Sequence, residues 1–297
     1  MFPFTRKLAV DGLQFWWRVC RFILIVVFLQ PSFTMAFDKF DASNIPHVGP
    51  RARDNFIEYT YSNDHKVFAI APGGGWAWSS GQSSEEGARE TALQQCQSHS
   101  AQTCVVYAVN DQVVFDRPNW TRLWRPYMNE VQAQAAPTGT HRGARFHNLK
   151  FRDQSGNVKN IADFRGTVTL LHFWGSWCPP CMRELPSLRQ LYLDLGRQLP
   201  DQVEMIMLQV REPYETSMHW ARENDLADLP LYDSGVTGAE DDRLKMAGAQ
   251  TIHDRKIAMA FPTSYVLDKQ GVVIFSHQGP VSDWGEYLHF LEDATKH

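Results

Sequence analysis

This chain of 297 residues has only a short apolar run, little net charge and few cysteines, and each of these limits the classes of protein to which it can belong. The apolar run near the N-terminus, Phe22 to Leu29, has eight residues, well short of the ~20 that span a bilayer. The formal net charge is only -4 and no basic cluster stands against it, so nothing indicates nucleic-acid binding. Cysteine is limited to five residues, and four of them form two local pairs. That even count outside the N-terminal segment suits an oxidising compartment.

The N-terminal segment has the features of an export signal. Four basic residues lie before or within the approach to the apolar run: Arg6, Lys7, Arg18 and Arg21. Small residues around Ala36 then offer a cleavage site. We predict a cleaved signal peptide and a periplasmic or otherwise exported protein; an uncleaved membrane anchor is the alternative, which the short run disfavours. Cys20 is followed by Arg21 rather than by a small residue, which argues against a lipoprotein.

The remaining length is enough for roughly two domains of about 100–200 residues. The predicted boundaries are residues 1–36 for the signal peptide, 37–65 for a lead-in, 66–116 for a small domain, 117–144 for a linker that is flexible over 132–143, and 145–297 for a second domain. The small domain reads as two strands, a helix opened by Ser83 as N-cap with Glu86 three residues later, and two more strands. This is an α+β module of order ββαββ.

Cys96 and Cys104 close a short loop in that module. We predict a structural disulfide between them that stabilises the fold by roughly 2–3 kcal/mol, because so small a domain needs a covalent cross-link. A second redox pair and a metal site that includes His99 are weaker alternatives. The module resembles a family of small secreted domains of unknown function. The resemblance is carried by the segments Ala69-Ile70-Ala71-Pro72, Trp76-Ala77-Trp78 and Cys104-Val105-Val106-Tyr107-Ala108-Val109 and by the helix that ends in Cys96.

The second domain alternates strands and helices. Strands are expected over residues 146–151, 168–173, 203–210, 263–267 and 272–277, and helices after Cys178 and over 216–226, 241–249 and 284–291. This order predicts an α/β domain with the thioredoxin-like layout, a central mixed sheet with helices on both faces.

The segment Trp177-Cys178-Pro179-Pro180-Cys181 lies where a buried strand passes into a helix. Cys178 is placed at the helix N-terminus, where free N–H groups and the helix dipole favour a thiolate. Cys181 lies one turn further, within reach to resolve a mixed disulfide. Zinc sites use the same spacing, but no second cysteine pair occurs at ribbon spacing, so we predict no metal.

Two segments resemble the TlpA/ResA branch of exported thioredoxin-like proteins. They are Asp163 to Pro186, which contains the cysteine pair, and Phe261-Pro262-Thr263-Ser264-Tyr265-Val266-Leu267-Asp268. The resemblance implies that Cys178 attacks a substrate disulfide and Cys181 releases it. It also implies that Pro262 is a cis-proline facing the disulfide and that the Phe261 backbone pairs with substrate, with Trp177 and Thr263 beside it. An ordinary proline at a strand start is the alternative for Pro262.

Two further residues are candidates for proton chemistry. Glu184 matches an acidic residue that tunes the cysteine pKa values in this branch; the alternative is a solvated helix glutamate. His172 stands where thioredoxins carry a buried aspartate. A neutral imidazole with a pKa near neutrality would serve as general base for the resolving thiol. The alternative for His172 is a core histidine bonded to a backbone carbonyl.

The segment 235–260 is longer than this branch usually has before the proline. It is expected to form either a substrate-selecting loop beside the active site or a solvated helix with a surface turn.

These features predict an exported protein-disulfide oxidoreductase, acting as a reductase, for example in cytochrome c maturation. It needs no cofactor, exchanges disulfides with protein thiols and receives electrons from a membrane-bound donor. The small domain would bind a substrate or partner. Two alternatives remain: a Cu(I) metallochaperone that uses the cysteine pair, and a binding module in which the fold is only a scaffold.

Overall fold

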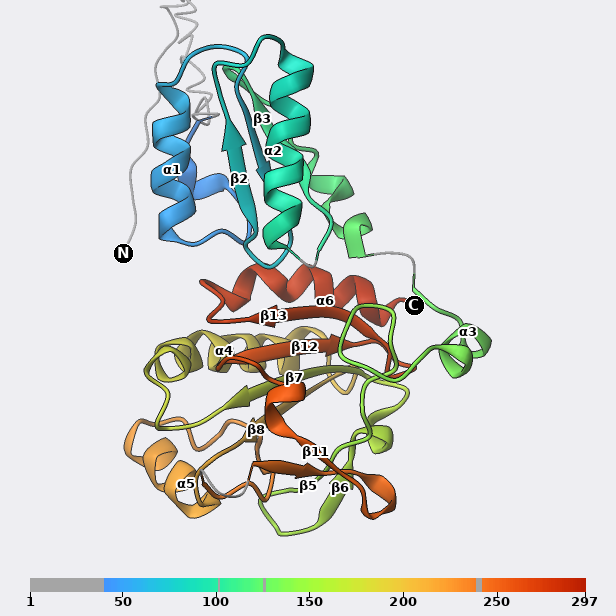
Figure 1. The fold of residues 1–297 in the computed structure, drawn as a ribbon. Coiled ribbons are helices and arrows are strands. Elements are labelled where there is room, and N and C mark those ends of the chain that lie inside the picture. The colour runs from blue at the N-terminus through green and yellow to red at the C-terminus, as the bar shows by residue number, and fades with distance from the viewer. Residues whose placement is uncertain (1–39, 101, 125–126, 239–241) are drawn as a thin grey trace, which may run out of the picture. The chain divides into compact units, whose positions relative to one another are not determined.

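The structure is a computed structural model that describes residues 40–297, apart from residues 101, 125–126 and 239–241 (Figure 1). The predicted signal peptide lies outside the described residues. Among the residues described, no helix is both long and apolar enough to cross a bilayer. The secondary structure forms a four-stranded sheet near the start of the described chain, a seven-stranded sheet after it and a separate two-stranded hairpin.

The four-stranded sheet is antiparallel, in the order β2-β1-β3-β4. Its strands are β1 (Val67–Ile70), β2 (Trp76–Ser79), β3 (Val105–Val109) and β4 (Gln112–Val113). Alternate residues of β1 face opposite sides, as strand geometry requires. Phe68 and Ile70 pack with α1 (Pro50–Thr60), whereas Val67 and Ala69 pack with α2 (Glu85–His99). The sheet therefore has a helix on each face.

Two local features of this module differ from the sequence prediction. Helix α1 lies in the segment that we expected to be a lead-in, and it buries Ala52, Phe56 and Tyr59 in the core of the module. The N-cap of α2 is Ser84 rather than Ser83, because the Ser84 hydroxyl accepts the hydrogen bond from the Gly87 N–H. The predicted disulfide between Cys96 and Cys104 is present, with an S–S distance of 2.06 Å.

Residues 117–144 were expected to be a linker, flexible over 132–143, but much of this segment has regular secondary structure. It contains a 3₁₀ helix (Arg117–Trp124) and α3 (Glu130–Ala135), which begins with a capping box between Asn129 and Gln132. Ala133 and Ala144 are buried. Small residues had suggested flexibility, but here they allow close packing.

The seven-stranded sheet is mixed, in the order β13-β12-β7-β8-β9-β5-β6. Strands β7, β8 and β9 run parallel, and the other pairings are antiparallel. The strands are β5 (Lys150–Arg152), β6 (Val158–Asn160), β7 (Val168–Trp174), β8 (Val203–Gln209), β9 (Leu231–Asp233), β12 (Thr263–Leu267) and β13 (Val273–Gln278). This is the predicted thioredoxin-like architecture with a central mixed sheet.

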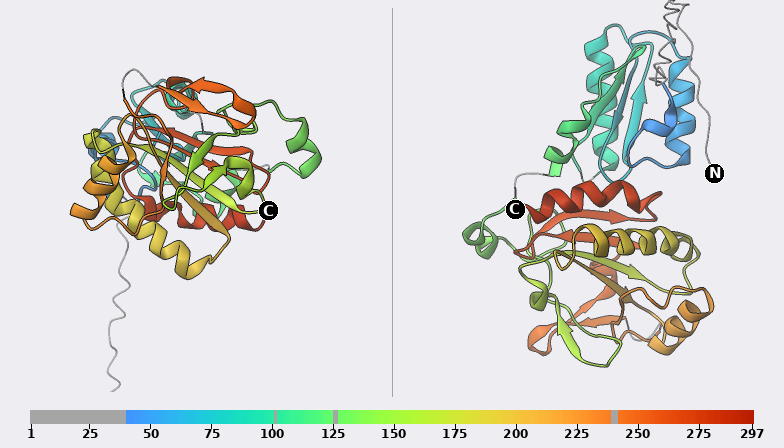
Figure 2. Two further views of the ribbon diagram at one scale, coloured as in Figure 1. Left: turned by 90° about the horizontal axis from the view of Figure 1, so that it is seen from below. Right: turned by 180° about the vertical axis from the view of Figure 1, so that it is seen from behind.

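The α-helices of the second domain all pack on one face of that sheet. Helices α4 (Pro179–Gln198), α5 (Tyr214–Glu223) and α6 (Leu288–Thr295) share one core cluster with Leu170 of β7. Leu171, on the opposite face of β7, packs instead with the segments 146–164 and 236–258. Figure 2 shows α4 and α6 on one side and the hairpin of β10 (Arg243–Lys245) and β11 (Thr251–His253) on the other. We expected helices on both faces, but among the described residues the second face carries only short 3₁₀ turns.

The helix expected over 241–249 is wrong. The described part of this segment forms a hairpin of β10 (Arg243–Lys245) and β11 (Thr251–His253), followed by a 3₁₀ turn (Asp254–Lys256). Gly248 and Ala249 have φ values of 79° and 63°, so the chain turns in the left-handed region where a helix would have to continue.

Candidate active site around Cys178 and Cys181

The two cysteines lie between the carboxyl end of β7 and the first turn of α4. Cys178 is the N-cap of α4, and its Sγ accepts the Cys181 N–H at 3.3 Å. The pair is disulfide-bonded, with 3% of Cys178 and none of Cys181 exposed. Pro179 and Pro180 occupy the first helical positions, where a missing N–H leaves no bond unmade. Cys178 therefore has the helix N-terminal position that the motif predicted, and Cys181 is the more buried of the two.

The turn before Cys178 is anchored to the chain that follows β8. The Trp177 indole N–H donates to the Val210 carbonyl at 2.9 Å. A Cβ on Gly175 would lie 2.2 Å from the indole nitrogen, so only glycine lets the ring fold back in this way. The indole nevertheless remains 43% exposed, beside the nearly covered Cys178.

A buried carboxylate that the sequence analysis missed supports the same turn. Glu212 is 7% exposed and accepts hydrogen bonds from the Ser176 N–H at 2.6 Å, the Ser176 hydroxyl at 2.5 Å and the Ser217 hydroxyl at 2.5 Å. Three donors satisfy its charge in a place where an unpaired carboxylate would be costly. Its only sequence signal is an acidic residue directly after a buried strand, which is too common to single it out.

The residues expected to contact a substrate lie between the β10–β11 hairpin and the start of β12. The Phe261–Pro262 peptide bond is cis. The Phe261 ring meets the Trp177 ring edge-on, with centroids 5.3 Å apart. Thr263 differs from its expected place among them. Its side chain is fully buried and its hydroxyl donates to the Ala260 carbonyl at 2.6 Å, so it orders the turn instead of facing substrate.

Glu184 is buried on the face of α4 that also carries Cys181, three residues before it. Its Oε1 accepts hydrogen bonds from the Val281 N–H at 3.1 Å and from the Trp284 indole, while Oε2 has no partner in the described part of the chain. Burial raises the pKa of Glu184 to about 7, although the two hydrogen bonds oppose that rise. The alternative of a solvated helix glutamate is wrong.

His172 lies on β7 with no exposed surface. Its Nδ1 is 2.9 Å from the Ser264 hydroxyl of β12, and its Nε2 has no partner among the described residues. The ring meets the Trp284 ring edge-on at 6.3 Å, so His172 and Glu184 both contact Trp284. Burial lowers the pKa of His172 to about 3, which contradicts our expectation of a pKa near neutrality. The alternative also needs correction, since the partner is a hydroxyl and not a carbonyl.

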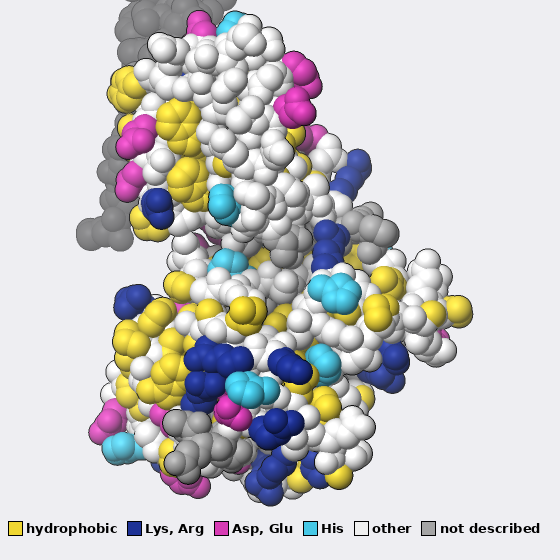
Figure 3. Space-filling view, viewed as in Figure 1, with side chains coloured by type: hydrophobic (Ala, Val, Ile, Leu, Met, Phe, Trp, Pro, Cys, Tyr) yellow, Lys and Arg dark blue, Asp and Glu magenta, His cyan; other side chains and the backbone are white. Residues whose placement is uncertain are grey.

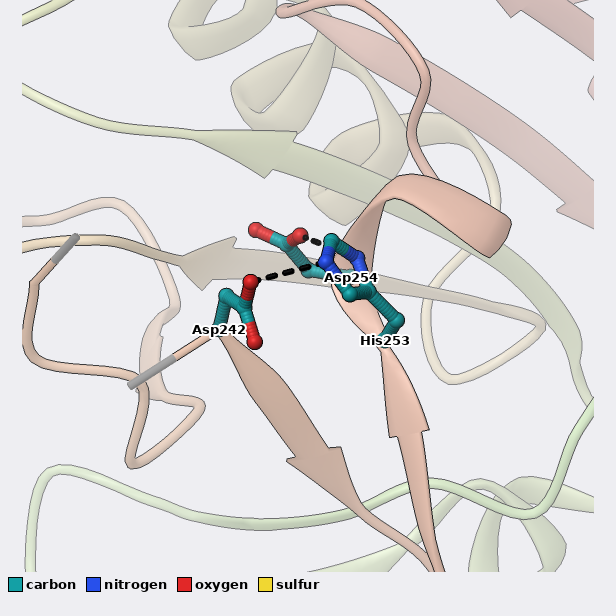
Figure 4. A group of neighbouring side chains, drawn as sticks. All are labelled: Asp242, His253 and Asp254. Atoms are coloured by element: carbon teal, nitrogen blue, oxygen red, sulfur yellow. Dashed lines mark ion pairs between the residues drawn. The ribbon is translucent and has the colours of Figure 1, made fainter. Parts of the chain in front are cut away.

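A second charged group lies at the start of the 3₁₀ turn that follows β11 (Figure 4). Asp242, His253 and Asp254 place one ligand-type atom each within 4.8 Å of one another. The Arg255 N–H donates to His253 Nδ1 at 3.1 Å, and His253 Nε2 lies 2.7 Å from Asp242 Oδ2. Both oxygens of the buried Asp254 accept from Arg211. This is the geometry of an ion-pair network that fixes Arg211 rather than that of an open metal site.

A family model named Redoxin matches residues 133–287, which is just over half of the chain. The chain belongs to the Redoxin family. The match covers β5 to η6 (Trp284–Tyr287), including the cysteine pair and the cis-proline, and it begins inside the segment that we had assigned to the linker.

Curated proteins are similar to part of this chain. Thiol-disulfide oxidoreductase ResA from Bacillus thuringiensis subsp. konkukian is 29% identical over 132 residues, covering 44% of this chain and 66% of the relative. ResA from Geobacillus thermodenitrificans is 31% identical over 121 residues, covering 41% and 60%. The chain thus spans just under two thirds of these relatives' own length.

A secreted thiol-disulfide isomerase from Corynebacterium glutamicum is a solved structure with 20% identity, 50% of this chain and 84% of that chain covered, and a TM-score of 0.39. This TM-score is too low to support a conclusion about the fold. The thioredoxin-like fold of the Redoxin domain is shown by the order of its strands.

Proposed function

We propose that this chain is an exported protein-disulfide reductase that acts through Cys178 and Cys181. The observation that carries the proposal is the position of the pair: Cys178 caps α4 beside an exposed Trp177, and Cys181 is fully buried behind it. A nucleophile at a helix N-terminus with a resolving thiol one turn away is what thiol–disulfide exchange requires. The names of the ResA relatives support the same reaction class.

The exchange has two steps. In the reduced protein, the Cys178 thiolate attacks one sulfur of a substrate disulfide, which forms a mixed disulfide and releases the first substrate thiolate. The Cys181 thiolate then attacks Cys178 Sγ, which forms the intramolecular disulfide and releases the second substrate thiolate. Two electrons pass to the substrate, and its two sulfurs take up the two protons that the cysteines lose.

Cys181 must lose its proton in a buried place, and Glu184 is the better acceptor of the two candidates. Its pKa of about 7 lies closer to that of a thiol than the pKa of about 3 of His172 does. Glu184 also shares the buried face of α4 with Cys181. In this proposal His172 is a neutral partner that holds Ser264 and packs on Trp284, and it carries no proton in the exchange.

The direction and the setting rest on the resemblance to the TlpA/ResA branch. An exported dithiol lies in an oxidising compartment, so a membrane-bound donor must return its electrons. Reduction of cytochrome c cysteines before haem attachment is the task that the resemblance favours. The module of residues 66–116 would hold the substrate or a partner, stabilised by its own disulfide.

Insulin reduction tests the reaction. The wild type should accelerate precipitation of the insulin B chain in the presence of dithiothreitol, and Cys178→Ser should abolish that acceleration. The double variant Cys96→Ala/Cys104→Ala, which removes only the structural disulfide, should keep it. Equal activity of wild type and Cys178→Ser would show that the domain is a scaffold and not an enzyme. Equilibration of the Cys178–Cys181 pair with glutathione would then give its potential and decide between reductase and oxidase.

A further inference from the structure

Phe261, the residue before the cis-proline, lies between two guanidinium groups. Arg255 places its Cζ 5.0 Å from the ring centroid, and Arg211 places its Cζ 5.8 Å from the same point. Both distances are within the range of cation–π attraction. Arg211 comes from the turn after β8 and Arg255 from the 3₁₀ turn after the hairpin, so two distant segments meet on one ring.

The two arginines differ in how their charge is balanced. Arg211 donates from two nitrogens to the carboxylate of Asp254, and this pair is close to neutral as a unit. Arg255 donates from Nη1 to the Met259 carbonyl at 2.7 Å. Among the residues that the structure describes, no carboxylate pairs with Arg255. Within the described residues, Arg255 is therefore held at one nitrogen by a neutral carbonyl, and its other nitrogens have no acceptor.

Arg255 also lies next to the candidate exchange site. Its ring partner Phe261 contacts Trp177, which directly precedes Cys178. The surface around it is apolar as well as cationic, because Trp177 is 43% and Met259 70% exposed. Figure 3 shows Lys and Arg side chains beside hydrophobic ones on the face in view of the second domain.

We propose that Arg255 is a specificity-determining residue that binds an acidic side chain near the cysteine of a protein substrate. This inference rests on the proposed function and deepens it by naming the substrate class. The planar guanidinium fork matches a carboxylate, and the Phe261 ring and the Met259 carbonyl already hold it, so little side-chain freedom is lost on binding. Preferred substrates carry Asp or Glu close to the disulfide and an apolar residue that covers Trp177 and Met259.

Matched peptides test this substrate class. Three peptides with one internal disulfide would differ only in the residue next to the first cysteine, which is Glu, Gln or Lys. The measured quantity is the second-order rate constant at which each peptide oxidises the pre-reduced full chain, at low and at high salt. For wild type we expect the Glu peptide to react about three to five times faster than the Gln peptide at low salt, and the Lys peptide slower than both. High salt should shrink these ratios.

Two variants assign the preference to one side chain. Arg255→Gln should bring the Glu-to-Gln rate ratio close to one. Lys256→Gln removes the neighbouring exposed positive charge, which stacks on no aromatic ring in the described part of the chain, and should keep the wild-type ratio. Because the readout is a ratio within each variant, a general loss of rate does not affect it.

The outcomes separate the two proposals. A wild type that is oxidised by all three peptides at equal rates, or fastest by the Lys peptide, would overturn the acidic-substrate inference and leave the reductase proposal standing. An unchanged ratio in Arg255→Gln would overturn the role of Arg255. If no peptide oxidises the wild type faster than Cys178→Ser, the proposed function fails and this inference fails with it.

Discussion

The carboxylate of Glu212 accepts two hydrogen bonds from Ser176, one from its backbone N–H and one from its hydroxyl. The two residues are 36 positions apart in the chain, and Ser176 is two residues before the nucleophile of the proposed exchange. The segment that follows β8 therefore helps to determine the shape of the turn that presents Cys178, while β8 itself pairs with β7.

Removing this carboxylate should destabilise the oxidised protein. Glu212→Ala leaves a buried N–H and two hydroxyls without their acceptor, so we expect the free energy of unfolding in urea to fall by about 1–3 kcal/mol. Glu212→Gln keeps one acceptor oxygen and should lose less. Glu215→Gln, at an exposed position of α5, serves as control and should stay within about 0.5 kcal/mol of wild type. A Glu212→Ala variant as stable as this control would contradict the anchoring role.

Stability should depend on pH through Glu184. Its folded pKa of about 7 lies above the ordinary value of 4.5, so the folded state binds a proton that the unfolded chain has lost between those pH values. Glu184 therefore costs nothing below pH 4.5 and its full penalty, roughly 3 kcal/mol, above pH 7. The unfolding free energy of Glu184→Gln should gain on wild type by about that amount as the pH rises from 4 to 8. A difference that stays constant with pH would contradict the raised pKa.

His172 should act in the opposite range. Burial lowers its pKa from 6.5 to about 3, so the unfolded chain binds a proton there that the folded chain does not. His172 therefore costs no unfolding free energy above pH 6.5, and its destabilising effect grows as the pH falls toward 3. His172→Asn should therefore show a shallower decline in unfolding free energy with acid than wild type, and an equally steep decline would contradict the lowered pKa.

His172→Asn also tests whether this histidine takes part in catalysis. A histidine with a pKa of about 3 does not titrate between pH 6 and 9, so the pH profile of insulin reduction by His172→Asn should keep the inflections of wild type. A lost or shifted inflection would restore His172 as the general base that we first expected.

The sequence predicted those features that a short stretch of chain determines. The apolar run before Trp177 indicated a buried strand, and the two prolines after Cys178 fitted the first turn of a helix, so the position of the cysteine pair could be predicted. The disulfide between Cys96 and Cys104 could be predicted from their short separation in the sequence. The cis bond before Pro262 followed from the resemblance, since no local pattern distinguishes it from a trans bond.

The remaining features depend on contacts between distant residues. Charged residues at 240–243 suggested a helix, but left-handed turns at Gly248 and Ala249 and the burial of Leu244 favour a hairpin on the sheet. The pKa of His172 depends on how completely other segments cover it, and the role of Glu212 depends on a serine one strand away. None of these relationships leaves a periodic trace in the sequence.

The nearly complete cover over the oxidised pair has a consequence for how electrons arrive. With 3% of Cys178 and none of Cys181 exposed, a donor thiol meets only a narrow patch of sulfur beside the Trp177 indole. If the proposed exchange operates, the donor that re-reduces this disulfide would have to reach Cys178 with a cysteine on a projecting loop or tail. The shape of that projection, in addition to its potential, would then help to select the donor.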